Sequence, residues 1–422
     1  MAKHIQMPPI YPIPPNWTWV ELRKLTQITS GYPFDSKLFS NLPEEGRPLI
    51  RIRDIVRGYT ETFTSEPCPE QYIIHNNDIL IGMDGDFNVG RWHDGDALLN
   101  QRVCFIQSIS NLLINDYLFY FLPAPLKQIN DVTPSVTVKH LSTKTIGSIM
   151  IPLPPVEEQL RLIELIDALF SKLDEAKENA QNVVEGFETR KAAILHKAFT
   201  GELTAKWREE NGVAHLFATK RFDEVAIIKS NLVDPAEYQN YPHIAPDNIE
   251  KKTGILMEYR TIAEDNVKSG KHRFYPGQIL YSKIRPNLSK VVVVDFDGLC
   301  SADMYPIEAI GDTKCLWYFM LSENFLEQAS SAGSRSVLPK INQKELSALT
   351  VTIPDSIEEQ KELSRLIDSL LTKEYHVKDS AETVVDQIDT MKKAILARAF
   401  RGELGTNDPT EESAKELLRK IL

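Results

Sequence analysis

The amino-acid sequence predicts an α+β fold in which two α+β globules alternate with two long helices, and the helices pair as an antiparallel coiled coil with a pseudo-twofold internal repeat. Three observations predict it: a long internal repeat, two stripes of apolar residues at helical spacing, and short β-branched runs between turn residues. The 422 residues exceed what one ordinary core accommodates, so two or three structural units are expected.

The repeat is the strongest signal in the chain. Residues 190–203 read RKAAILHKAFTGEL and residues 391–404 read MKKAILARAFRGEL, with nine of fourteen positions identical at an offset of 201. The same offset aligns the EEQ triplets at 157–159 and 358–360, whereas upstream of a one-residue insertion the offset is 200. A repeat of about 200 residues is far longer than a solenoid unit, so each copy is a domain plus an appendage.

The second part of each copy has helical periodicity. From Leu160 to Ala198, apolar residues recur at steps of three and four, after Pro154 and Pro155 and before Gly201. About 40 residues at 1.5 Å each predict one rod of roughly 60 Å. Residues 358–400 keep the pattern with interruptions. Each stripe is too apolar for water, so the helices are expected to pair, either as a brace or as a surface that also binds partners.

The first part of each copy consists of short strand-like runs, such as 72–81 and 279–284, separated by Gly, Pro, Asn and Asp. We therefore expect four segments. They are a first globule at 1–152, a first long helix at 153–210, a second globule at 211–353, and a second long helix with a C-terminal helix at 354–422.

Composition and motifs predict a non-catalytic cytoplasmic protein without a membrane segment. The start of the chain has no leader-like pattern, and charged or proline residues interrupt its apolar stretches. Its four cysteines form no CxxC pair, so no metal site or disulfide is expected. The sequence contains no phosphate-binding loop, no dinucleotide-binding glycine motif and no zincin motif. It also lacks the Asn-Pro-Pro-aromatic tetrapeptide that is typical of adenine methyltransferases. No catalytic residue and no cofactor is therefore predicted on this chain.

The net charge of −11 gives no support for nucleic-acid binding, but its distribution is uneven. Residues 266–294 contain no acid and six Lys or Arg residues interleaved with aromatic residues. Such cations clamp phosphates, and a guanidinium also reads guanine edges. The alternative is a solvated basic face.

Polar loops at 133–139 (TPSVTVK) and 330–340 (SSAGSRSVLPK) precede a helix near the end of each globule. Their hydroxyl residues and cations suit a hairpin that enters a DNA groove. An ordinary exposed turn has the same composition.

The paired signatures IPLPPVEEQ at 151–159 and TIPDSIEEQ at 352–360 each lead into a helix that ends in KAAILHKAFTGEL or KKAILARAFRGEL. In these motifs the chain resembles the specificity (S) subunit of type I restriction-modification systems, over nearly its whole length. The resemblance implies that each globule is a target recognition domain for one half of a split, asymmetric double-stranded DNA site, with the helices setting the unread gap.

It also implies partners. Two adenine-methylating (M) subunits would dock on the helices, and ATP-driven restriction and translocase (R) subunits would join to cut unmodified foreign DNA. S-adenosylmethionine, ATP and Mg would belong to those subunits. A duplicated coiled-coil scaffold with two protein-binding modules and no DNA binding is the alternative, and salt-dependent DNA affinity would separate the two.

Cationic, aromatic and hydroxyl residues in the loops and basic stretches are the predicted DNA contacts. They are Tyr32, Arg53, Arg91, Trp92, Thr137 and Lys139 in the first globule, and Lys271, His272, Arg273, Lys283, Arg285, Asn287, Arg335 and Lys340 in the second.

Overall fold

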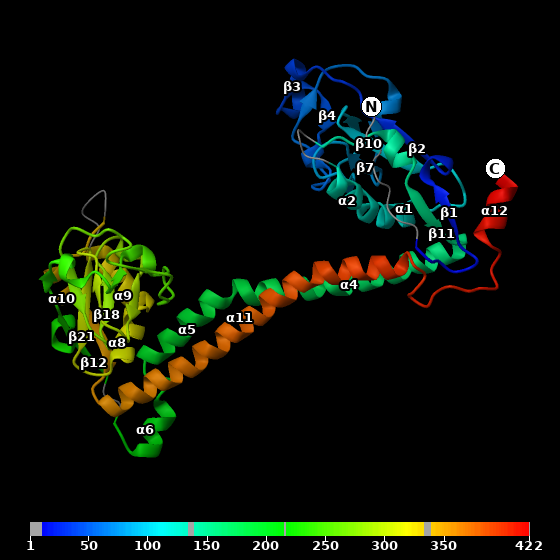
Figure 1. Cartoon of the computed structure of the whole chain (residues 1–422). Coiled ribbons are helices and arrows are strands. Elements are labelled where there is room, and N and C mark those ends of the chain that lie inside the picture. Colours follow the sequence, from blue (N-terminus) through cyan, green and yellow to red (C-terminus); the bar gives the residue numbers. More distant parts are fainter. Residues whose placement is uncertain (1–10, 134–138, 215–216, 333–338, 422) are drawn as a thin grey trace. The chain divides into compact units, whose positions relative to one another are not determined.

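The computed structural model describes residues 11–133, 139–214, 217–332 and 339–421 (Figure 1). They form two compact units. The first unit combines the chain up to Glu178 with the segment from Val385 onward, and the second comprises Asn179–Val384. Each unit contains one globule and parts of the long helices, so the α+β class with long helices is confirmed.

The first globule is built on two main sheets and one strand pair. A four-stranded antiparallel sheet has the order β2-β10-β7-β8, a five-stranded sheet has the order β3-β5-β4-β9-β6, and β1 pairs with β11. The bounds are β1 Thr18–Glu21, β2 Thr26–Ser30, β3 Phe39–Ser40, β4 Arg47–Ile50, β5 Phe63–Thr64, β6 Ile73–Ile74, β7 Ile79–Gly82, β8 Val89–Arg91, β9 Ala97–Leu99, β10 Val103–Ser108 and β11 Met150–Leu153. Helices α1 (Asn115–Phe121), α2 (Pro123–Val132) and α3 (Thr143–Gly147) complete the globule.

The second globule repeats this plan. Its four-stranded sheet has the order β13-β21-β18-β19, its five-stranded sheet has the order β14-β17-β20-β15-β16, and β12 pairs with β22. The bounds are β12 Phe217–Arg221, β13 Ala226–Ile228, β14 Leu232–Val233, β15 Pro242–Ile244, β16 Arg260–Thr261, β17 Lys271–Phe274, β18 Ile279–Ser282, β19 Val291–Val293, β20 Gly298–Cys300, β21 Met304–Ala309 and β22 Thr350–Pro354. Its helices are α7 (Phe222–Val225), α8 (Thr313–Met320), α9 (Glu323–Ala332) and α10 (Gln343–Ser347).

The first long helical segment differs from its prediction as one unbroken helix. Helix α4 spans Val156–Glu185 and α5 spans Phe187–Phe199, with Gly186 between them. A glycine weakens a helix because it has no side chain and more backbone freedom. The Arg190 guanidinium donates to the Val183 carbonyl at 2.9 Å beside this break, and to Glu374 at 2.7 Å. The second long helix, α11 (Ile357–Ala399), is continuous. Two short helices, α6 (Ala205–Asn211) and α12 (Ala414–Ile421), follow the long ones.

The long helices contact each other inside each unit. In the first unit Lys177 pairs with Asp389 at 2.9 Å, and Asp174 pairs with Lys392. In the second unit the rings of Phe187 (α5) and Tyr375 (α11) lie 4.9 Å apart. Because the residue numbers change in opposite directions along these contacts, the helices run antiparallel where they touch.

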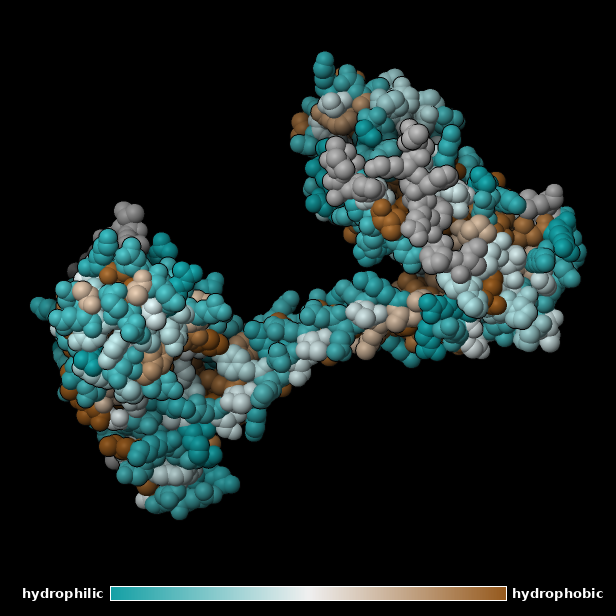
Figure 2. All heavy atoms as spheres, in the orientation of Figure 1, coloured by the Kyte–Doolittle hydropathy of each residue, from teal (hydrophilic) through white to brown (hydrophobic). Residues whose placement is uncertain are grey.

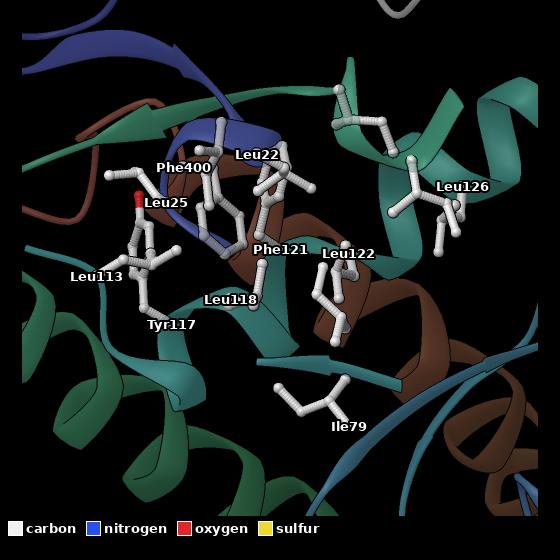
Figure 3. Close-up of a cluster of buried hydrophobic side chains, with 14 of the residues drawn as sticks. Leu22, Leu25, Ile79, Leu113, Tyr117, Leu118, Phe121, Leu122, Leu126 and Phe400 are labelled. Atoms are coloured by element: carbon white, nitrogen blue, oxygen red, sulfur yellow. The ribbon is translucent and has the colours of Figure 1, made fainter. Parts of the chain in front are cut away.

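The end of α11 belongs to the core of the first globule. Phe400 follows α11, is almost fully buried, and packs edge-on against Tyr117 and Phe121 of α1 at 5.1 and 5.3 Å between ring centroids (Figure 3). In the second unit the matching Phe199 packs on Phe319 of α8 at 5.1 Å. Each globule is therefore completed by the helix end of the other repeat.

The EEQ triplets explain why this arrangement holds. Glu359, at the start of α11, is buried and accepts hydrogen bonds from Thr204 at 2.7 Å and from Arg208 of α6 at 2.6 Å. In the first unit Glu158 is buried and accepts from Thr406 at 2.6 Å and Arg161 at 2.9 Å. Thus the second glutamate of each triplet binds the threonine that follows the GEL motif of the opposite repeat.

The glutamine of each triplet serves the backbone. Gln159 accepts from the Ile114 amide at 2.9 Å and donates to the Leu112 carbonyl at 2.7 Å. Gln360 accepts from the Asp312 amide at 2.8 Å and donates to the Pro354 carbonyl at 2.7 Å. A buried backbone group without a hydrogen-bond partner is costly. The side-chain amides of the two glutamines supply such partners and thereby tie the start of each long helix to the loop before α1 or α8.

Replacing Glu359 with alanine should destabilise the second unit by about 3–5 kcal/mol, because the Arg208 guanidinium would stay buried without its partner. Urea unfolding read out by hydrogen exchange in each unit measures this. The exposed neighbour Glu358 supplies the matched control, and E358A should cost less than about 1 kcal/mol because it loses a helix N-terminal charge and one exposed hydrogen bond from Ser356. Equal losses in the two variants would contradict the assignment.

Replacing Phe400 with alanine should lower the free energy of unfolding of the first unit by about 3–5 kcal/mol, as is typical for emptying a buried aromatic position. The conservative variant F400L should lose clearly less. The same exchange measurement, compared between amides of the first and second units, tests whether the loss falls on the first. A loss confined to the second unit would contradict the packing described here.

Candidate nucleic-acid interface

A tight turn follows the equivalent central strand of each globule. We call residues 83–88, between β7 and β8, the first turn, and residues 283–290, between β18 and β19, the second turn. In the first, Leu141 donates to the Met83 carbonyl at 2.7 Å and Gly85 donates to that of Lys139 at 3.1 Å.

The second turn has the same pattern 200 residues later. Ile341 donates to the Lys283 carbonyl at 2.9 Å, and Arg285 donates to the Pro339 carbonyl at 2.7 Å. The end of each polar loop, at Lys139 or Lys340, is thereby held against a turn.

Beside the second turn, two lysines share one carboxylate. Lys340 lies 3.0 Å from Asp303, and Lys283 lies 3.7 Å from the same oxygen. Beside the first turn the arrangement recurs with other residues, because Asp84 pairs with His140 at 2.7 Å and Arg102 at 3.4 Å. Each globule thus places two basic groups around a single acid next to its turn.

Positive charge is crowded near the second turn. Burial lowers the pKa of Lys283, and the positive charge of Lys340 lowers it further. Burial and the charge of Lys283 also lower the pKa of His272, whose buried Nδ1 has no partner among the described residues. A group whose protonated form is disfavoured by neighbouring cations gains from an approaching anion, so this region is suited to phosphate.

The predicted contact residues of the second globule fall into three groups. Arg285, Asn287 and Lys340 are exposed on or beside the second turn, whereas Lys283 is only partly exposed. Lys271 and His272 are buried on β17. Arg335 lies outside the described residues.

Arg273 is surrounded by tyrosine rings. Its guanidinium lies 4.8 Å from the ring centroid of Tyr275, 5.4 Å from that of Tyr238 and 5.9 Å from that of Tyr241. Cation–π contacts on this scale hold the side chain within its own globule.

In the first globule the predicted residues are mostly engaged internally. Trp92 is fully buried and donates to the Gly95 carbonyl at 2.6 Å, and Arg91 pairs with Asp116 and lies over the ring of Phe119.

The remaining predicted contact residues of the first globule are less enclosed. Tyr32 is partly buried against Phe34 and Tyr72, and the Arg53 side chain is half exposed beside Thr62. Lys139 donates to the Asn130 carbonyl at 2.6 Å. Thr137 lies outside the described residues.

The sequence reasoning did not select Asp84, Arg102, His140 and Asp303 for the interface. Residues 84 and 102 lie in runs of ordinary surface composition, and nothing local marks them. Aligning the copies at the offset of 200 could have found His140, since this alignment pairs it with Lys340.

Within residues 11–133, 139–214, 217–332 and 339–421, no three His, Cys, Asp or Glu side chains are close enough to hold a metal ion. No helix in those ranges has the length and apolarity to cross a membrane. The face drawn in Figure 2 is largely hydrophilic, with scattered hydrophobic patches. Leu232 and Ile310 are among the exposed hydrophobic residues.

Comparison with known proteins agrees with this architecture. The family described as "Type I restriction modification DNA specificity domain" matches residues 14–185 and 216–379. The type I restriction enzyme EcoDI specificity subunit of Escherichia coli is 33% identical over 442 aligned residues, covering 97% of this chain and 95% of that subunit. The EcoBI specificity subunit of the same species is 31% identical, covering 96% and 92%.

Among solved structures, the HsdS subunit from Thermoanaerobacter tengcongensis has the same fold, with a TM-score of 0.62 at 16% identity, covering 93% of this chain and 99% of that one. The family model matches a segment in each of the two repeats, and both relatives align over nearly the whole chain. The chain therefore belongs to the family of specificity subunits of type I restriction-modification systems.

Proposed function

We propose that this chain is the DNA-reading subunit of a type I restriction-modification complex that methylates host DNA and restricts foreign DNA. Its target recognition domains would be residues 1–152 and 211–353, and each would bind one half of a bipartite, asymmetric site. The observation that carries the proposal is the duplicated turn, with two basic groups around one acid in each globule.

The spacers at 153–210 and 354–422 would separate the half-sites. Inside both units the long helices already touch in antiparallel direction, through Lys177–Asp389 and Arg190–Glu374. We infer that they pair as an antiparallel coiled coil along their length and thereby set the unread gap. The hydrogen bonds Thr204–Glu359 and Thr406–Glu158 support this inference, because each joins the start of one long helix to the segment that follows the end of the other.

Catalysis would reside on partner subunits. Two methyltransferase (M) subunits, supplied with S-adenosylmethionine, would methylate adenines, and restriction (R) subunits with ATP and Mg would translocate and cut. The chain itself would contribute sequence recognition and assembly, without catalytic groups or cofactors.

The proposed DNA contacts divide into phosphate-positioning and base-reading residues. Lys283, Lys340 and Lys139 next to the turns suit phosphate, because they are cations held beside the loops that would approach the DNA. Arg285 and Asn287 on the second turn, with Tyr32 and Arg53 in the first globule, have accessible polar atoms for base edges. The interior positions of Trp92, Lys271 and His272 favour supporting roles for these three.

Mapping of N6-methyladenine in DNA from cells that carry this system should reveal one motif with two specific halves and a fixed unread gap. The purified chain alone should neither methylate nor cut DNA. A continuous motif, or methylation independent of this subunit, would contradict the proposal.

Replacing Lys340 with alanine should weaken DNA binding of the complex with M subunits by a similar factor for every duplex. The slope of log affinity against log salt should fall by about one, as expected when one phosphate contact is lost. The matched control is K229A, because Lys229 forms a 3.0 Å ion pair with Glu308 on the same globule and has similar exposure. Equal salt slopes for K340A and wild type would remove Lys340 from the interface.

A further inference from the structure

We propose that Arg285 reads a guanine of the second half-site in the DNA major groove, and that the second turn is built to present it. The inference rests on the proposed function and goes further by naming the residue and the base. Its support comes from three features of Arg285: its backbone conformation, the lack of a side-chain partner among the described residues, and the hydrogen bonds that hold the turn.

The backbone of Arg285 is left-handed, with φ 48° and ψ 60°. L-residues other than glycine rarely adopt this conformation, because the Cβ atom crowds the following carbonyl. The equivalent position of the first turn is Gly85, with φ 77°, and a Cβ there would meet nothing within 4 Å. The first turn has six residues and the second eight, and the third residue is the favourable glycine in one and a strained arginine in the other. Such strain persists where it serves a function.

The Arg285 side chain is exposed and has no partner within the described part of the chain. Among the described residues, none forms a hydrogen bond, ion pair or ring contact with its guanidinium. This contrasts with Arg273, which is enclosed by tyrosines, and with Lys283 and Lys340, which share Asp303. A structural role for the strained arginine would require a partner within the protein.

The second turn is rigid around Arg285. The Arg285 amide donates to Pro339 at 2.7 Å, and its carbonyl accepts from Leu288 at 2.9 Å. Pro286 is buried directly after it, and Ser289 donates to the Pro286 carbonyl at 3.0 Å. A preorganised backbone reduces the entropy lost when the side chain binds.

Guanine is the base that an arginine recognises best. Its O6 and N7 accept two parallel hydrogen bonds from one planar guanidinium, which no other base edge allows in the major groove. The neighbouring Lys283 and Lys340 can supply the phosphate contacts that set the register, so the guanidinium is free for the base.

The test uses the complex with M subunits and a panel of duplexes in which each base pair of the mapped second half-site is replaced in turn. For R285G, affinity for the cognate duplex should fall about 10- to 100-fold, the range expected for a bidentate arginine–guanine contact. Preference at one G·C pair should vanish while the other positions keep theirs. The Tm should not decrease, because glycine relieves the left-handed strain.

Two further variants complete the design. R285N keeps a residue that tolerates the left-handed conformation and should also lose the guanine preference. The control K252G removes a different exposed cation with positive φ, 64°, keeps the backbone amide that donates to the Leu288 carbonyl at 3.1 Å, and should leave the base preferences unchanged.

Distinct results would overturn the proposal. Unchanged preferences in R285G and R285N would exclude base reading by Arg285. A uniform loss over all duplexes with a smaller salt slope would identify a phosphate contact instead. A wild-type complex that binds every duplex alike would contradict the proposed function itself.

Discussion

The crosswise hydrogen bond between Glu359 and Thr204, with its counterpart between Glu158 and Thr406, is the interaction on which the remaining structure depends. Both glutamates are buried at the start of a long helix, so each requires a partner that can donate hydrogen bonds. That partner follows the end of the other helix in both cases. A duplicated chain can satisfy both carboxylates in this way only if the helices run antiparallel where they meet.

This constraint also completes the hydrophobic cores. Once the helix ends are tied to the opposite starts, Phe400 falls between Tyr117 and Phe121, and Phe199 falls on Phe319. Neither globule has a full core without residues from the other repeat. The globules are therefore attached to the helical segments by packed side chains as well as by the chain itself, which suits a protein proposed to measure a distance between two DNA half-sites.

The net charge of −11 and the proposed DNA binding are compatible because the relevant charges are local. Burial lowers the pKa values of Lys283 and His272, and neighbouring cations beside the second turn lower them further. In the first globule Asp84 lies on the first turn itself, with His140 and Arg102 paired to it, whereas Asp303 of the second globule lies directly before β21. Partner subunits that add cationic surface would strengthen binding without any change in this chain.

The sequence by itself determined the duplication, the long helices and the α+β class, because each depends on local periodicity or on comparing the chain with itself. It also singled out Arg285 as one candidate among many. Tertiary structure alone decided that Trp92 is interior, that Glu158 meets Thr406, and that Arg285 is left-handed and exposed. Those features depend on contacts between residues distant in the chain, such as the bond from Arg285 to Pro339, and no local pattern encodes them.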